Sequence, residues 1–161
     1  MYELEMNGQV VRLNFGMGFL REINRTVSAP VNGLNGVTQN IGLRYTVARL
    51  IDKDVEALVK VISVANKGCE PRVTEGAIDA FVENEETDMD EVFENILGFL
   101  RKANATKNAT LEVIEEVEKE KAKQEAMEKA RMEVMHKASK NTTMKRRLTA
   151  SGILGLKAYQ K

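Results

Sequence analysis

The chain has 161 residues, of which 43% are hydrophobic and 30% charged, and this is enough to bury one substantial core. Its 24 basic and 24 acidic residues balance, so the net charge gives no indication of a polyanionic partner. Cys69 is the only cysteine, which excludes an internal disulfide, and residues 1–5 lack the basic start and apolar run of a signal peptide. No stretch is apolar enough to span a bilayer, so we expect a soluble intracellular protein with no membrane partner.

Two short strands are expected at the start of the chain, at residues 2–6 and 9–14. Apolar and polar residues alternate in both segments, which is the period of a half-buried strand. Asn7-Gly8 separates them and is the strongest short-range signal for a hairpin. A two-stranded hairpin is marginal by itself, so it must pack on helices or pair with another subunit.

The junction between this hairpin and the first helix carries Gly16-Met17-Gly18. One interpretation is a phosphate-cradling turn, but Phe19 and the residues after it provide neither the third glycine of a dinucleotide fingerprint nor a Gly-Lys-Ser/Thr sequence. We therefore interpret the two glycines as a structural turn. Phe15, Met17 and Phe19 lie close together here, and we expect all three to seed the core.

The first helix is expected to end near residue 27, because a residue that precedes proline avoids the helical region and Pro30 follows. Residues 32–36 indicate a turn-rich loop, and helical periodicity begins at Thr38. The later helices of this part are marked by their caps and stops: N-caps at Asp52, Thr74 and Asp88, a stop at Gly68, and a last helix ending near Ala103.

The rest of the chain indicates an extended charged helix. After a hinge at residues 105–108, helical spacing runs from about 109 to 139, with acids near its start and bases near its end. Asn141-Thr142-Thr143 is expected to break it before a basic final segment, residues 144–161. The predicted fold is mainly α, with an N-terminal β-hairpin and a compact bundle of about five helices in residues 1–104. Residues 105–161 form a long charged helical arm with a basic, partly flexible end.

A partner-binding surface is predicted on the arm. Small residues recur at four-residue spacing with methionines beside them, which allows close approach of another helix, and methionine surfaces adapt to varied partners. The basic cluster at 145–147 leaves open a contact with nucleic acid or a merely solvated tail, although the neutral chain and scarce aromatics argue against nucleic acid. The candidate residues are Met127, Ala130, Val134, Met135, Lys145, Arg146, Arg147, Leu148, Ile153 and Leu154.

No catalytic, cofactor or metal site is indicated. His136 is the only histidine and lies among charged residues. We therefore expect no serine or cysteine nucleophile, because none has a plausible histidine to act as its base. A zinc site is not expected either, because the chain offers only one cysteine and one histidine as ligands. Asp88-Met89-Asp90 begins like a calcium loop, but Phe93 occupies the place of the required glycine, which favours a helix cap. We do not expect an enzyme.

The order of these segments resembles the tail assembly chaperones of long-tailed bacteriophages (siphoviruses) of Gram-positive hosts. The resemblance covers about residues 1–104. It is carried by the hairpin and by Leu13-Asn14-Phe15-Gly16-Met17-Gly18-Phe19-Leu20-Arg21-Glu22-Ile23-Asn24, Gly42-Leu43, Leu50-Ile51-Asp52-Lys53-Asp54-Val55-Glu56-Ala57-Leu58, Ala65-Asn66, Val73-Thr74 and Gly98-Phe99-Leu100-Arg101-Lys102-Ala103-Asn104.

The resemblance implies a non-enzymatic oligomeric chaperone of the host cytoplasm that is absent from the mature virion. Such proteins bind the tape measure protein, keep it soluble and help to recruit tail tube subunits. The family commonly makes a second, longer product by frameshifting, and residues 105–161 could belong to either product. Two alternatives are a structural tail or neck component, which the single expected hairpin disfavours, and a small nucleic-acid-binding regulator.

Overall fold

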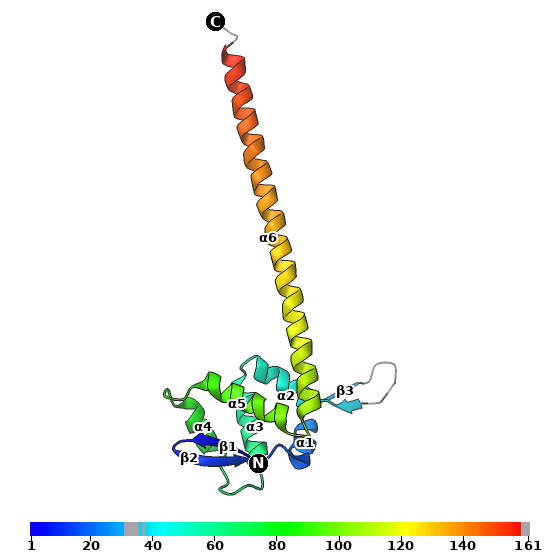
Figure 1. The fold of residues 1–161 in the computed structure, drawn as a ribbon, viewed down its shortest axis with the longest axis vertical. Coiled ribbons are helices and arrows are strands. Elements are labelled where there is room, and N and C mark those ends of the chain that lie inside the picture. Colours follow the sequence, from blue (N-terminus) through cyan, green and yellow to red (C-terminus); the bar gives the residue numbers. More distant parts are fainter. Residues whose placement is uncertain (31–35, 37, 159–161) are drawn as a thin grey trace. The chain divides into compact units, whose positions relative to one another are not determined.

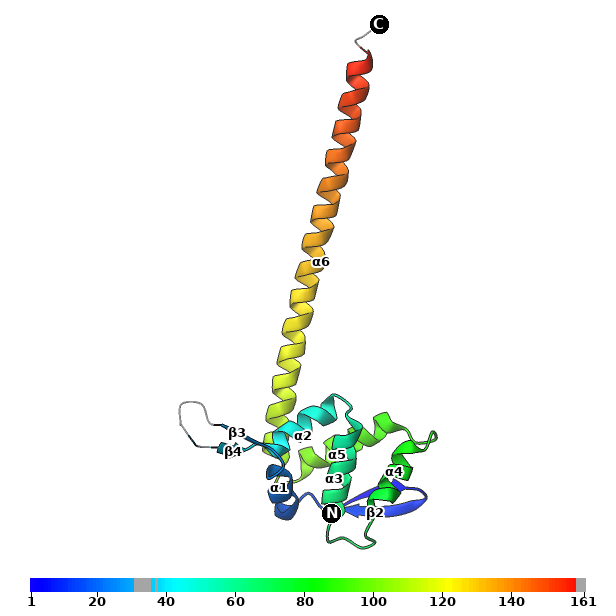
Figure 2. The ribbon, with the colours of Figure 1, turned by 180° about the vertical axis from the view of Figure 1, so that it is seen from behind.

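The computed structural model describes the backbone of residues 1–30, 36 and 38–158, and their side chains except those of 137–139 and 141–158. This part of the chain contains six helices and two two-stranded sheets, so the predicted mainly α fold with an N-terminal hairpin, five body helices and a long last helix is confirmed (Figures 1 and 2). The chain divides into two units, Met1–Val117 and Glu118–Lys161, which we describe separately. The predicted loop at residues 32–36 lies largely outside the described residues.

The predicted N-terminal hairpin is present. Strands β1 (Tyr2–Met6) and β2 (Gln9–Leu13) pair in antiparallel register, with Leu4 opposite Val11. Asn7 and Gly8 both have positive φ, at 51° and 73°, as the twist of a two-residue hairpin requires. The inward side chains of the two strands are buried in the core of the first unit, which supplies the packing surface that an isolated hairpin lacks.

Helix α1 (Met17–Asn24) follows, with Gly16 in an extended conformation at its N-cap. Phe15 and Phe19 are buried, and their rings pack edge to face with centroids 5.0 Å apart. The prediction that Met17 also enters the core is wrong, because its side chain is 52% exposed in the first turn of α1. Helical periodicity brings Phe19 and Ile23 to the buried face and leaves Met17 outside it.

A second hairpin, which the sequence analysis did not predict, joins strands β3 (Ser28–Pro30) and β4 (Thr38–Asn40). Helix α1 therefore ends at Asn24 rather than near 27, and the helix expected from Thr38 begins only at Gly42. Both strands are three residues long and mostly exposed, so they carry no apolar alternation that could have indicated them.

Four further helices, α2 to α5, lie wholly within the first unit. Helix α2 (Gly42–Ile51) ends at Asp52, and α3 (Val55–Asn66) is capped by Asp54, which accepts a hydrogen bond from the Ala57 N–H. The predicted cap at Asp52 is wrong, because Lys53 turns the chain with a φ of 60° before α3 begins. The caps at Thr74 and Asp88 are confirmed: they begin α4 (Glu75–Glu83) and α5 (Met89–Lys102).

Helix α3 lies at the centre of the first unit (Figures 1 and 2), where it contacts α1, α2, α4 and β2. A backbone hydrogen bond of 2.8 Å from the Asn14 N–H to the Ala65 carbonyl ties it to the end of the first hairpin. The buried amide of Asn66 donates to the carbonyls of Arg12 and Pro71 and accepts from the Val73 N–H. One side chain thus holds together a strand, the end of α3 and the loop that leads to α4.

Helix α6 (Lys107–Ala158) begins after a turn at residues 103–106 and runs without interruption. Its first turns belong to the first unit: Thr106, Thr110 and Val113 are buried, and the Thr106 hydroxyl donates to the Leu100 carbonyl at 2.7 Å. The predicted break at residues 141–143 is wrong, since Asn and Thr cost a helix only a few tenths of a kcal/mol each and do not stop it. No helix in the described part of the chain is long and apolar enough to cross a membrane.

Candidate partner-binding site

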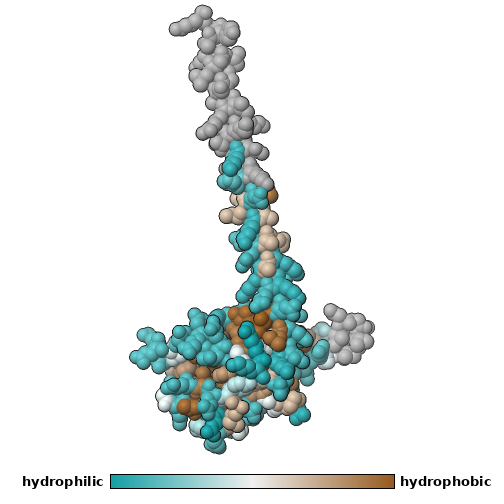
Figure 3. Space-filling view, in the orientation of Figure 1, coloured by the Kyte–Doolittle hydropathy of each residue, from teal (hydrophilic) through white to brown (hydrophobic). Residues whose placement is uncertain are grey.

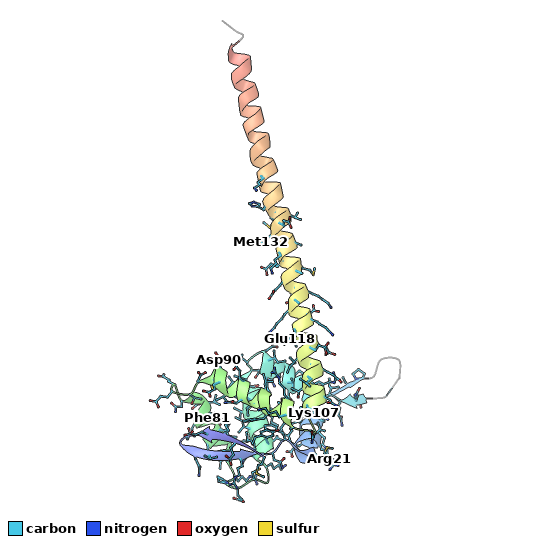
Figure 4. All side chains as sticks on the ribbon, viewed as in Figure 1. Arg21, Phe81, Asp90, Lys107, Glu118 and Met132 are labelled. Carbon is cyan, nitrogen blue, oxygen red and sulfur yellow. The ribbon has the colours of Figure 1, made fainter. Side chains whose placement is uncertain are left out.

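Four of the predicted contact residues lie in the described part of α6, and we name them the methionine stripe: Met127, Ala130, Val134 and Met135. All four are exposed: Met127 is 73%, Val134 66% and Met135 62% accessible to solvent. Successive residues of an α-helix turn by about 100°, so positions 127, 130 and 134 share one face. A third exposed methionine, Met132, is labelled in Figure 4; it lies about 140° around the helix from Met127 and about 60° from Met135.

The surroundings of the methionine stripe are charged. In Figure 3, hydrophobic residues in the described part of the arm are interspersed among hydrophilic ones. One contact of opposite charge in the described part of the helix joins Lys123 Nζ and Glu120 Oε2, which lie 3.5 Å apart. A helix that is polar on most sides has no core to join, so its exposed apolar side chains are available to another molecule.

The remaining predicted contact residues are Lys145, Arg146, Arg147, Leu148, Ile153 and Leu154. Their backbone continues α6. Their side chains lie outside the described residues, so the structure gives no geometry that joins them to the methionine stripe.

A second surface, which the sequence analysis missed, is a groove of about 520 Å³ between α3 and α4, named here the α3–α4 groove. Its apolar lining includes Val55, which is 42% exposed, and the half-buried Val59 and Val82. Carboxylates surround this lining, and Lys60 is the only cation among the described lining residues. The groove therefore offers an apolar floor with an acidic rim.

Three carboxylates of the rim come from one face of α4: Glu75, Asp79 and Glu83 follow each other at four-residue spacing. All three side chains are exposed, and within the described residues none has a hydrogen bond or ion pair. The fourth carboxylate of the rim, Glu56, accepts from Arg49 at 3.2 Å. The four-residue spacing was readable in the sequence, but the groove itself depends on the packing of α4 against α3.

A comparison with known protein families shows which family the chain belongs to. The model of a family described as phage tail assembly chaperone protein, TAC, matches residues 3–113. The chain belongs to this family. No curated protein and no solved structure matches it.

The matched residues of the chaperone run from β1 to the early turns of α6, which is nearly the whole first unit. The α3–α4 groove therefore lies within the part that the chaperone shares with its family. The methionine stripe and the basic final segment lie beyond the matched residues.

An ion pair anchors the N-terminal end of α3, which borders the groove. Arg49 donates from Nε to the Asp54 carboxylate at 2.6 Å, while the other oxygen of Asp54 caps the Ala57 N–H at 3.2 Å. The hydrogen bond from Arg49 lowers the pKa of Asp54, and the same bond raises the pKa of Arg49. The start of α3, and with it Val55, is thereby held in place from the end of α2.

The described residues of the chaperone contain no group of three or more His, Cys, Asp or Glu side chains arranged to hold a metal ion. His136 is exposed on α6, as predicted. The Asp88 carboxylate, which opens the calcium-like sequence, accepts from the Glu91 N–H at 3.1 Å and acts as a helix cap.

Proposed function

We propose that this chaperone is a non-enzymatic protein of the host cytoplasm that binds the tape measure protein, keeps it soluble and helps to recruit tail tube subunits, and that it is absent from the mature virion. The observation that carries the proposal is the match of residues 3–113 to the tail assembly chaperone family. The family gives the general role, and the named partners follow from the resemblance and from the surfaces described above.

A physical argument supports the tape measure protein as the partner. A tape measure exposes apolar surface along a great length before the tube assembles around it, and such surface aggregates unless it is covered. The methionine stripe provides exposed, adaptable apolar side chains on a soluble charged helix. Many copies of a small helical protein could cover the tape measure in this way, which also fits the proposed homo-oligomer.

The test compares two faces of α6 in the full-length protein. The double variant Met127→Asp and Val134→Asp places charge on the methionine stripe. His136→Asp places charge at an exposed position about 100° or more around the helix from every residue of the stripe and serves as the control. Each variant is co-expressed with a tagged tape measure protein from the same phage, and both proteins are quantified after affinity purification.

We expect the double variant to lose most of the co-purified tape measure, because carboxylates cannot enter an apolar interface without a partner. The control should retain it. Equal recovery of all three proteins would remove the methionine stripe from the proposed interface. Recovery of the chain as a stoichiometric component of purified virions would favour the structural alternative instead.

A further inference from the structure

The α4 wall of the α3–α4 groove carries a row of negative charge. Glu75, Asp79 and Glu83 are exposed along it, and no cation pairs with them among the described residues. Four residues of a helix rise by about 6 Å, so the row extends over about 12 Å. Like charges at this spacing repel each other, and cations held opposite them relieve the repulsion. This wall therefore suits a ligand that presents basic side chains over about two turns of a helix.

The α3 wall of the groove has a different charge. The carboxylate of Glu56 accepts from the Arg49 guanidinium at 3.2 Å, so its charge is already compensated. One turn further along α3, Lys60 is exposed and has no acidic partner in the described part of the chain. A ligand in the groove therefore meets three unpaired carboxylates on one side and an unpaired ammonium group on the other.

An apolar floor lies between the two walls. Val55 is 42% exposed, and Val59 and Val82 are half-buried. An amphipathic helix can cover such a floor with the apolar stripe on one of its faces, and removal of this surface from water is favourable. The first unit, residues 1–117, has 19 acidic and 12 basic residues, and its net charge of −7 draws a ligand with net positive charge towards it.

We propose that the α3–α4 groove binds an amphipathic helix of another protein, which carries bases on the flank that faces α4, an acid on the flank that faces Lys60, and an apolar stripe between them. Docking of a helix in a groove is a recurring mode of recognition. The order of charges fixes the direction of the bound helix, because the reversed helix would place its bases against Lys60. The basic end of this chain does not fit, since residues 134–161 contain no acid.

The inference goes beyond the proposed function and does not depend on it, because it involves neither the methionine stripe nor the tape measure protein. The probes are three designed, fluorescently labelled peptides of about 18 residues, a length at which an isolated helix can form. The ordered peptide has a leucine stripe with lysines on one flank and glutamates on the other. The scrambled peptide has the same composition in random order. The acid-flanked peptide keeps the leucine stripe and has glutamates on both flanks.

Binding to the full-length protein is measured by fluorescence anisotropy at about 50 mM and about 0.5 M salt, where screening is weak and strong. The groove variant carries Asp79→Lys and Glu83→Lys. The matched control carries Glu5→Lys and Glu94→Lys, because these exposed acids belong to the same unit, do not line the groove and give the same change in net charge. Hydrogen exchange of the α3 and α4 amides verifies that each variant folds.

We expect the parent to bind the ordered peptide about tenfold more tightly than the scrambled peptide at low salt, and the difference should narrow at high salt. The groove variant should bind the ordered peptide about tenfold more weakly, because attraction at two positions becomes repulsion, and the control should bind it like the parent. Lys60→Glu should weaken the same peptide by about threefold, since one contact changes sign. The acid-flanked peptide should prefer the groove variant to the parent.

That reversed preference separates recognition by the groove from misfolding, because a misfolded variant gains no ligand. Equal binding of the ordered and scrambled peptides by the parent would overturn the inference and would indicate general attraction between charges. Undiminished binding of the ordered peptide by the groove variant would also overturn it and would place the site elsewhere. Self-association of the parent that the groove variant abolishes and the ordered peptide does not displace would give the groove to a second copy, against the inference.

Discussion

Asn66 is the residue whose replacement should most clearly damage the first unit. Its side-chain amide is buried and makes hydrogen bonds of 3.0, 3.1 and 2.7 Å with the Arg12 carbonyl, the Pro71 carbonyl and the Val73 N–H. In Asn66→Ala all three backbone groups lose their partner. Each unsatisfied buried group costs roughly 1–3 kcal/mol, and partial access of water favours the lower value, so we expect a loss of about 3 kcal/mol. A typical domain is stable by only about 5–15 kcal/mol.

The assay is urea denaturation of the full chain, combined with hydrogen exchange of the α3 amides, because α6 contributes its own helical signal to circular dichroism. With a typical slope of about 1–3 kcal/mol per molar urea, the midpoint should fall by about 1–3 M. Asn95→Ala is the matched control, since Asn95 is exposed on α5, and it should change stability by less than about 0.5 kcal/mol. If Asn66→Ala unfolds at the same urea concentration as the control, the hydrogen bonds of Asn66 do not stabilise the fold.

Three further predictions concern backbone packing, pH and surface charge. In Gly42→Ala the new Cβ would lie 2.8 Å from the carbonyl carbon of Ile23, so stability should fall by about 1–3 kcal/mol, whereas Gly98→Ala has open space and should be neutral or stabilising in thermal melts. Because the pKa of Asp54 is lowered in the folded protein, its stabilising effect is present above about pH 4 and is lost as the pH falls through that lowered pKa. Asp54→Asn should therefore be less stable than the parent at pH 7, and a difference in stability that does not narrow as the pH falls below about 4 would refute this. Arg44 pairs with carboxylates of α6 at the surface, so Arg44→Ala should cost less than about 1 kcal/mol in urea, and a larger, salt-independent loss would contradict that assignment.

Local patterns in the sequence predicted the elements whose apolar residues face one core. The first hairpin shows strict alternation around Asn7-Gly8, and α5 combines a cap at Asp88 with a regular apolar face, so both were predictable. Strands β3 and β4 bury almost nothing, so periodicity could not indicate them. The sequence offered two aspartates, Asp52 and Asp54, as the N-cap of α3. Lys53 turns the chain between them with a positive φ, so Asp54 is the cap.

Of the two candidate surfaces, one could be predicted from the sequence and the other could not. The exposure of the methionine stripe follows from a charged helix without a core, and that was visible in the sequence. The α3–α4 groove joins Val55 and Val59 with Asp79 and Val82, residues 20 to 27 positions apart in the sequence, and only the packing of two helices brings them together. Spacing along one helix could show the row of acids but not the apolar floor beside it.

The most direct test of the central claim is co-expression of the full-length chain with the tape measure protein of the same phage, followed by measurement of the tape measure in the soluble fraction and in the purified complex. We expect the tape measure to precipitate when it is expressed alone and to be recovered as a soluble complex when this chain is present. A tape measure that precipitates equally in both cases, with this chain free in solution, would contradict this expectation.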